Sequence, residues 1–270
     1  MQWVCHNGTF KPVSQPLFTA TNRSFKWGDA LFETGTFSDG RLLLALFHFE
    51  RLFSGLQLLQ MVPSFTAEQL TEAIVALCKK NNCSALARVR IAVYREDDNS
   101  ASYVVEAMAI DAAKRQWNDV GWEVVFYPFA RKSCDVFANL KSANYLPYLM
   151  AARYAAEKGV DEGLILNMHN RICEGSRTNL FLLTGTDIYT PALSEGCVAG
   201  VMRRQVIDIL KSLGYAVHQK AITESELLEA EGMFLTNAVE GLRWVRRFGE
   251  KTYGHGVLKK IYHQLVASIA

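Results

Sequence analysis

Apolar positions along the chain recur with two different periods, and the period of each segment predicts its secondary structure. Residues 86–94 and 103–110 alternate between apolar and polar and predict strands, whereas residues 48–61 carry apolar side chains at helical spacing. Asn7-Gly8 suits the positive φ angles of a tight turn, so we expect a hairpin around it. Further strands are expected at residues 31–37, 42–47, 122–127, 163–167, 179–183, 187–190, 215–219 and 232–236, and further helices at residues 66–80, 147–158, 200–213, 223–230 and from about 256 onward.

This order of elements, with strands and helices mixed in both halves, predicts an α+β chain of two domains. The stretch that follows residues 103–110 is polar, with charges at Asp111, Lys114 and Arg115, and it is interpreted as the connection between the halves. We expect a small N-terminal domain at residues 1–114, a linker at residues 115–121 and a larger C-terminal domain at residues 122–270.

Composition excludes several classes of function. Half of the 270 residues are hydrophobic, enough for one large core or two smaller ones, and the net charge of +2 with scattered basic residues argues against a nucleic-acid partner. The six cysteines form no Cys-x-x-Cys pair and no Cys/His spacing, which favours reduced thiols and no metal. The longest uncharged apolar run is too short for a bilayer, and the first residues lack the pattern of a secretory signal. We therefore expect no membrane partner and a cytoplasmic location.

Lys141 has the most informative setting of any charged residue. It lies between apolar neighbours shortly before the predicted helix at residues 147–158, and about thirty residues before the motif Cys173-Glu174-Gly175. A lysine in apolar surroundings is costly to keep charged, so its free amine becomes usable as a nucleophile and base, as Schiff-base chemistry requires. The alternative is a solvated lysine at the start of a helix, and the local sequence alone does not decide between them.

Nine segments extend the pattern around Lys141 over nearly the whole chain. They are residues 7–8, 27–34, 48–52, 140–145, 161–166, 174–181, 189–191, 200–203 and 234–238. Together and in this order they resemble the class IV family of pyridoxal-phosphate enzymes, which includes branched-chain and D-amino-acid aminotransferases and 4-amino-4-deoxychorismate lyases. The resemblance implies fold type IV, which is D-amino-acid-aminotransferase-like, with a small N-terminal α/β domain and a larger C-terminal pseudo-barrel domain. It also implies pyridoxal 5'-phosphate as cofactor, a small-molecule substrate and a homodimer.

The resemblance assigns central roles to three residues. Lys141 matches the Schiff-base lysine, which also serves as the catalytic acid and base. Glu174 matches the carboxylate that keeps the pyridine nitrogen protonated, and Arg51 matches the arginine that binds the phosphate. For Arg51 the alternative is a solvated helix arginine occupied by its neighbour Glu50.

Other residues are implied to surround the cofactor or the substrate. Gly196 and Gly200 flank a loop that leads into the predicted helix at residues 200–213, so backbone N–H groups of Val201 and Met202 would face the phosphate. Met202 replaces a threonine that many members carry, which removes one hydroxyl contact. The remaining candidates are Tyr145, Thr236 and Asn237 at the cofactor, Phe32 and Arg243 at the substrate, and Trp27 and Tyr148 as pocket-lining aromatic residues. For each aromatic residue core packing is the alternative, and for Arg243 a surface salt bridge.

Two departures from the family's patterns distinguish among its reactions. D-amino-acid aminotransferases place an Arg-x-His carboxylate trap after the strand that corresponds to residues 88–95, where this chain has the acidic loop 96–100. Branched-chain enzymes usually carry Gly-Thr-Ala near the phosphate, whereas Thr236-Asn237-Ala238 followed by Gly241-Leu242-Arg243 looks more like 4-amino-4-deoxychorismate lyases. Trp244 replaces the proline that often comes next in that group.

The leading hypothesis is a pyridoxal-phosphate-dependent lyase that converts 4-amino-4-deoxychorismate to 4-aminobenzoate and pyruvate, a step of folate biosynthesis. The first alternative is a class IV aminotransferase that acts on a small branched-chain or D-amino acid. The second is a catalytically idle protein that binds pyridoxal phosphate.

Overall fold

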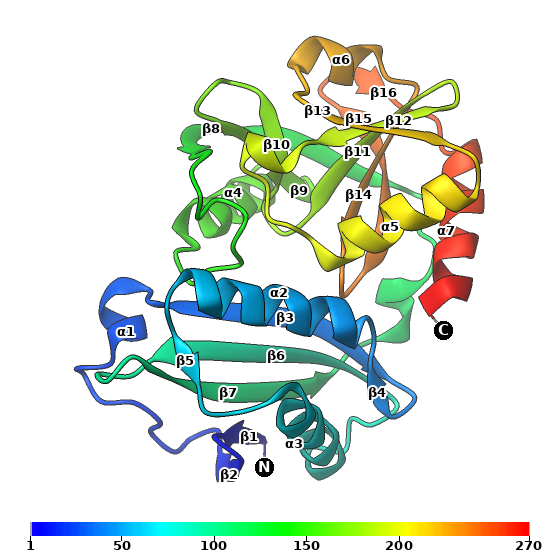
Figure 1. Cartoon of the computed structure of the whole chain (residues 1–270). Coiled ribbons are helices and arrows are strands. Elements are labelled where there is room, and N and C mark those ends of the chain that lie inside the picture. Colours follow the sequence, from blue (N-terminus) through cyan, green and yellow to red (C-terminus); the bar gives the residue numbers. More distant parts are fainter. Residues whose placement is uncertain (1, 270) are drawn as a thin grey trace. The chain divides into compact units, whose positions relative to one another are not determined.

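The structure is a computed structural model that describes residues 2–269 (Figure 1). The chain divides into two compact units, and each is built on its own sheet. Unit 1 extends to Arg115 and includes the short segment Lys141–Asn144; unit 2 consists of Gln116–Leu140 and the chain from Tyr145 onward. The segment with Lys141 therefore belongs to the N-terminal unit, although its neighbours in sequence belong to the other.

The described residues of unit 1 form a seven-stranded sheet in the order β2-β1-β7-β6-β3-β4, with β5 beside β7. All of its pairings are antiparallel except that of β5 with β7. Helix α2 packs against β3, and α3 packs against β7 and β1. The elements are β1 Trp3–His6, β2 Thr9–Pro12, α1 Arg23–Trp27, β3 Ala30–Ser38, β4 Arg41–Leu42, α2 Ala45–Leu58, β5 Val62–Pro63, α3 Ala67–Lys80, β6 Leu86–Arg95, β7 Ser100–Ala109 and the 3-10 turn Ala112–Arg115.

Local chemistry explains where several elements of unit 1 begin and turn. Asn7 and Gly8 have φ angles of 47° and 79°, so the predicted β1–β2 hairpin is confirmed. At the start of α3, Thr66 Oγ1 accepts a hydrogen bond from the Gln69 N–H, and Gln69 Oε1 accepts one from the Thr66 N–H. This reciprocal capping places the helix where the sequence predicted it.

The strand predicted at residues 42–47 is wrong beyond Leu42. The chain turns at Leu44, whose φ is 56°, and α2 begins at Ala45. The uninterrupted apolar run reads as a strand, but Phe49, Leu52 and Leu56 bury one face of a helix that extends back into this run. The helix consequently starts three residues earlier than expected and ends at Leu58.

The described residues of unit 2 form a nine-stranded sheet in the order β10-β9-β8-β15-β14-β11-β12-β13, with β16 beside β15. Strand β8 lies between two parallel neighbours, β9 and β15. Helix α4 packs against β8 and β9, and α5 packs against β13, β14 and α7. The elements are β8 Trp122–Lys132, α4 Leu146–Glu157, β9 Glu162–Asn167, β10 Ile172–Gly175, β11 Asn179–Thr184, β12 Asp187–Pro191, the 3-10 turn Leu193–Glu195, α5 Val201–Ser212, β13 Ala216–Lys220, α6 Glu224–Glu229, β14 Gly232–Asn237, β15 Gly241–Phe248, β16 Lys251–Thr252 and α7 Gly256–Ile269.

Most elements of unit 2 agree with the prediction, but β10, β15 and β16 were not expected. Strand β15 lies at the centre of the sheet although it carries three arginines, and Arg243 on it is buried. Apolar residues from one face of β14 and its neighbours form a core cluster, among them Leu180, Leu235 and Val245. All six cysteines are free thiols. No helix among residues 2–269 is long and apolar enough to cross a membrane.

Candidate functional site

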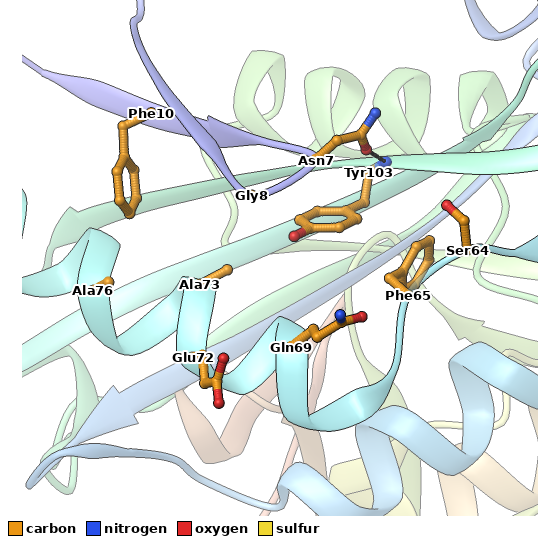
Figure 2. Close-up of a pocket in the computed structure, with 10 residues that line it drawn as sticks. All are labelled: Asn7, Gly8, Phe10, Ser64, Phe65, Gln69, Glu72, Ala73, Ala76 and Tyr103. Carbon is orange, nitrogen blue, oxygen red and sulfur yellow. Dashed lines mark hydrogen bonds between the residues drawn. The ribbon is translucent and has the colours of Figure 1, made fainter.

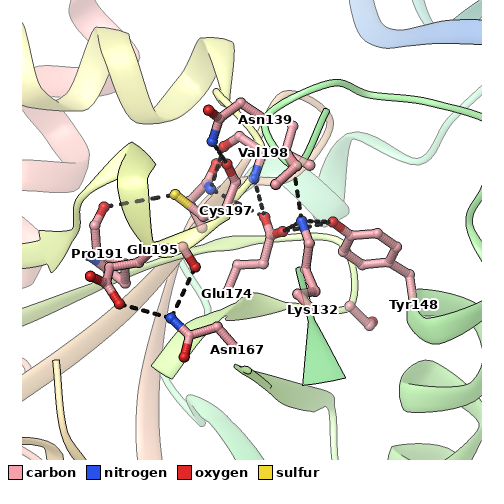
Figure 3. Close-up of polar contacts among 12 residues, drawn as sticks. Lys132, Asn139, Tyr148, Asn167, Glu174, Pro191, Glu195, Cys197 and Val198 are labelled. Atoms are coloured by element: carbon pink, nitrogen blue, oxygen red, sulfur yellow. Dashed lines mark hydrogen bonds and ion pairs between the residues drawn. The ribbon is translucent and has the colours of Figure 1, made fainter. Parts of the chain in front are cut away.

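Glu174 on β10 is the centre of a buried polar network in unit 2 (Figure 3). Its carboxylate Oε1 accepts hydrogen bonds from Lys132 Nζ at 2.6 Å and from the Tyr148 hydroxyl at 2.7 Å. Its Oε2 accepts one from the backbone N–H of Val198 at 3.0 Å. Because Glu174 is only 3% exposed, these donors replace water and hold the carboxylate in one orientation.

Lys132, at the end of β8, is a member of this network that the sequence analysis missed. Its ammonium also donates to the Ala138 carbonyl at 3.2 Å and to the Tyr148 hydroxyl. Burial by itself would lower the pKa of Lys132, but the Glu174 carboxylate outweighs it and raises the pKa above its usual value. The lysine is therefore charged at neutral pH and forms a buried ion pair with Glu174.

Two tyrosines at the start of α4 lie beside this pair. Tyr148, predicted only as a pocket-lining aromatic residue, donates to Glu174, and burial together with the Glu174 charge raises its pKa well above the usual value. The ring of Tyr145 stacks on that of Tyr148 with centroids 4.3 Å apart, and its hydroxyl donates to the Ser176 carbonyl at 3.1 Å. Tyr145 thus belongs to the same region, with Tyr148 making the direct contact to Glu174.

The N-terminus of α5 lies next to this network. Gly200, the residue that precedes the helix, is so close to Asn179 that an added Cβ would stand 1.9 Å from Asn179 Oδ1. Asn179 Nδ2 in turn donates to the Val198 carbonyl at 3.0 Å and lies 3.5 Å from Glu174 Oε2. The first backbone N–H groups of α5, including those of Val201 and Met202, consequently lie in the region of Glu174.

Thr236 on β14 joins the same region, because it stands opposite Asn179 in the pairing of β14 with β11. Its Oγ1 is buried and has no hydrogen-bond partner within residues 2–269, and no side chain of this part of the chain caps α5. A buried hydroxyl without a partner and an uncapped helix N-terminus both suit an anionic ligand that accepts hydrogen bonds. The residues present in unit 2 therefore fit a phosphate-bearing cofactor whose ring faces a carboxylate.

Asn237 and Arg243 are engaged within the protein. Asn237 Oδ1 accepts from the N–H groups of Val239 and Glu240 at 2.9 and 2.8 Å, so its side chain holds the turn between β14 and β15. Arg243 donates to the Gln116 carbonyl at 2.6 Å and is 5% exposed, and burial lowers its pKa. The surface salt bridge that stood as its alternative is wrong.

In unit 1, Arg51 on α2 is oriented by Glu33. Arg51 Nε donates to Glu33 Oε1 at 2.8 Å and Nη2 to Oε2 at 2.5 Å, while His48 Nδ1 lies 2.6 Å from Oε2. Burial would raise the pKa of Glu33, but Arg51 and His48 outweigh it and lower the pKa to about 2. A charged, two-point contact therefore fixes the plane of the guanidinium.

Lys141 lies along the start of β3. Its carbonyl accepts a hydrogen bond from the Phe32 N–H at 2.9 Å, and its Nζ lies 4.5 Å from the centroid of the Phe32 ring. Arg90 approaches the same ring at 4.6 Å. Two residues predicted separately, Lys141 and Phe32, thus lie together.

A pocket of about 390 Å³ in unit 1 involves none of the residues predicted to bind cofactor or substrate (Figure 2). It lies between the β1–β2 turn and α3, with Tyr103 and Phe65 among its aromatic residues and Gln69 and Glu72 on the helix. Trp27, expected near a pocket, is 59% exposed on α1.

Comparison with known proteins identifies the family. The amino-transferase class IV model matches residues 30–248. A probable branched-chain-amino-acid aminotransferase of Aquifex aeolicus (strain VF5) is 24% identical over 291 residues, covering 98% of this chain and 90% of that protein. An aminodeoxychorismate lyase of Bacillus subtilis (strain 168) is 25% identical over 255 residues, covering 92% and 87%. The pyridoxal-phosphate-bound form of a hypothetical aminotransferase from Mycobacterium tuberculosis superimposes with a TM-score of 0.87 at 18% identity, covering 99% of both chains.

The chain therefore belongs to the class IV aminotransferase family. This membership confirms the family and the fold class that the sequence predicted, and with them pyridoxal phosphate as the cofactor. Because its relatives include both aminotransferases and a lyase, membership establishes the class of enzyme and leaves the reaction to be argued from the residues.

Proposed function

We propose that the protein is a pyridoxal-phosphate-dependent lyase that converts 4-amino-4-deoxychorismate to 4-aminobenzoate and pyruvate. The segment Thr236-Asn237-Ala238 followed by Gly241-Leu242-Arg243, which looks like that of 4-amino-4-deoxychorismate lyases, favours this choice over a branched-chain aminotransferase. A D-amino-acid aminotransferase is disfavoured by the loop between β6 and β7. This loop presents Glu96, Asp97 and Asp98 where D-amino-acid aminotransferases have a basic carboxylate trap. The arginine next to this loop, Arg95, donates to Asp29 at 2.9 Å and to the Leu59 carbonyl at 2.6 Å. Its guanidinium is therefore bound to other parts of the protein.

The cofactor is proposed to be held by the residues that the resemblance assigns. Glu174 would pair with its pyridine nitrogen, the N–H groups of Val201 and Met202 would bind its phosphate, and Arg51 would add a guanidinium contact. Thr236 would supply its buried hydroxyl, and Tyr145 would contact the ring oxygen or phosphate. Asn237 would act by holding the turn that follows Thr236. When bound, the cofactor supplies an electron sink for the carbon that bears the substrate amine.

The chain's own residues would then hold the substrate and move one proton. Lys141 would anchor the cofactor through its amine and afterwards take the proton from the amine-bearing carbon. The Phe32 ring, 4.5 Å from Nζ, limits the volume in which the amine moves. Arg243 is proposed to meet a substrate carboxylate. Loss of the enolpyruvyl group gives an aromatic product, which supplies much of the driving force.

A branched-chain aminotransferase is the second candidate, because the Aquifex aeolicus relative is similar over nearly the whole chain. The Bacillus subtilis lyase supports the first candidate with similar identity. A homodimer, which the resemblance implies, and a cytoplasmic location, which the composition of the sequence favours, accompany either reaction as predictions; light scattering of the purified protein tests the first.

The two reactions differ in their need for an acceptor. A lyase forms 4-aminobenzoate and pyruvate from 4-amino-4-deoxychorismate with no 2-oxo acid present. An aminotransferase stops after one half-reaction unless a 2-oxo acid is added. Steady formation of 4-aminobenzoate without acceptor supports the proposal, whereas turnover of branched-chain amino acids that depends on 2-oxoglutarate and yields no aromatic product favours the second candidate.

A further inference from the structure

The mechanism proposed above makes no use of the buried ammonium of Lys132. We propose that Lys132 is a positioning residue that acts as the permanent counter-ion of Glu174. The pyridine nitrogen of the cofactor would then meet a Lys132–Glu174 ion pair instead of an isolated carboxylate. This inference rests on the proposed role of Glu174 toward the cofactor.

The ammonium of Lys132 is fully used inside unit 2 (Figure 3). A lysine has three N–H donors, and the structure provides three acceptors: Glu174 Oε1 at 2.6 Å, the Ala138 carbonyl at 3.2 Å and the Tyr148 hydroxyl. The side chain is only 8% exposed. Lys132 is therefore fixed in place by partners that do not depend on any ligand.

The geometry distinguishes Lys132 from the lysine that would anchor the cofactor. No ring fits between Lys132 Nζ and Glu174 Oε1 at 2.6 Å, so Lys132 cannot lie across a pyridine ring from that carboxylate. Lys132 is charged and donates to three acceptors within unit 2, and Lys141 belongs to unit 1, where its Nζ lies 4.5 Å from the centroid of the Phe32 ring. The two lysines thus suit different tasks: Lys132 supplies charge and Lys141 supplies a nucleophile.

The two oxygens of Glu174 face different partners, which allows the ion pair to persist when the cofactor binds. Oε1 accepts from Lys132 and Tyr148, while Oε2 accepts from the Val198 N–H and has only a long, 3.5 Å contact with Asn179. A carboxylate has about four lone-pair sites, and the long contact leaves one of them weakly used. Asn179 also adjoins Gly200 and pairs with Thr236, so Oε2 faces the residues proposed to hold the cofactor.

A positive charge on the far side of Glu174 opposes a protonated pyridine nitrogen on the near side. Like charges that share one carboxylate each weaken the other's hold on it. Lys132 would therefore stabilise the cofactor-free protein and lower its affinity for the cofactor. The Glu174 carboxylate then stays charged before the cofactor binds, and the cofactor-free and cofactor-bound proteins differ less in stability.

The test compares wild type with Lys132→Met, which removes the charge while keeping a long apolar side chain. We measure the thermal midpoint with and without cofactor, and the dissociation constant by titrating pyridoxal phosphate and following its absorbance. In Lys132→Met the cofactor-free midpoint should fall, the rise caused by cofactor should grow, and affinity should increase by about fivefold or more. Lys132→Arg, which keeps the charge, should restore both values toward wild type, and Lys220→Met, which removes an exposed ion pair with Glu226, is the matched control.

Equal losses of stability with and without cofactor, at unchanged affinity, would show a purely structural ion pair and overturn the inference. Weaker binding in Lys132→Met would also contradict it. If Lys132→Met does not fold, Lys132→Gln replaces it, because it keeps a hydrogen-bond donor without the charge. Glu174→Gln should weaken binding, the opposite sign to Lys132→Met. A wild-type protein that binds no pyridoxal phosphate would instead refute the proposed function, so the two failures are distinguishable.

Discussion

Gly200 faces Asn179 so closely that any side chain at position 200 would collide with the Asn179 amide, since a Cβ would stand 1.9 Å from its oxygen. The contact ties the start of α5 to β11, and through Asn179 to Glu174 and Thr236. One backbone position therefore connects the proposed phosphate end of the site with its pyridine end.

Gly200→Ala should force α5 or Asn179 to move. We expect a loss of about 1–3 kcal/mol in unfolding free energy, typical of overpacking, and a clear loss of affinity for pyridoxal phosphate. Denaturant unfolding and cofactor titration measure the two effects. Gly256→Ala, at the start of α7 where nothing lies within 4 Å of the added Cβ, is the matched control. Wild-type affinity in Gly200→Ala would contradict the placement of the cofactor at α5.

Thr236→Val should separate cofactor binding from stability. The hydroxyl is buried without a partner in the described part of the chain, so its replacement by a methyl group should leave the cofactor-free protein as stable as before or more stable by about 1 kcal/mol. Affinity for pyridoxal phosphate should fall, because the hydroxyl is proposed to bind it. Calorimetry and absorbance titration test this pair of results, and a destabilised protein with unchanged affinity would show that Thr236 serves only the fold.

Lys141→Ala should abolish covalent attachment of the cofactor and reduce formation of 4-aminobenzoate by roughly a thousandfold. Borohydride reduction followed by mass spectrometry of peptides should locate the cofactor on Lys141 in wild type and on no lysine in the variant. Lys158→Ala at the end of α4, outside the proposed site, is the control. Attachment to Lys132 instead would contradict both the role of Lys141 and the ion pair.

Acid should destabilise unit 1 through Glu33. Its pKa is about 2 in the folded protein and 4.5 without the fold, a difference that corresponds to about 3 kcal/mol. Because the folded pKa is depressed, this stability is fully present above pH 4.5 and is lost as pH falls toward 2. Unfolding free energies measured between pH 7 and pH 2 should show this loss in wild type. In Glu33→Gln stability should be lower at pH 7 and this part of the pH dependence absent; an unchanged slope would contradict the assignment.

Local signals made much of the fold predictable. Asn7-Gly8 defines its hairpin through backbone preference, and Thr66 with Gln69 defines the start of α3 through capping, so neither depends on distant residues. The strand predicted at residues 42–47 was wrong because a continuous apolar segment suits a strand and a buried helix equally. Strand β15 was not predicted because its arginines make the segment look solvent-exposed. Its central position follows only from its pairing with β8 and β14.

The residues of the candidate site also fall into those that the sequence signals and those that depend on distant partners. Lys141, Glu174 and Arg51 were predicted because they stand in ordered motifs along the chain. Lys132 could not be found by that route, since Arg131-Lys132 looks like the solvated end of a strand. Its burial depends on the irregular pairing of β8 with β9, where the register shifts between Phe126 and Arg131. A partner 42 residues away supplies the charge that keeps it protonated, and no local spacing signals that partner.

One time course tests the proposed lyase activity directly. Purified protein loaded with pyridoxal phosphate is mixed with 4-amino-4-deoxychorismate in the absence of any 2-oxo acid, and 4-aminobenzoate is followed by chromatography. We expect many turnovers, with one pyruvate formed for each 4-aminobenzoate. No 4-aminobenzoate from the loaded protein, together with amino-acid turnover that appears only when a 2-oxo acid is added, would contradict it.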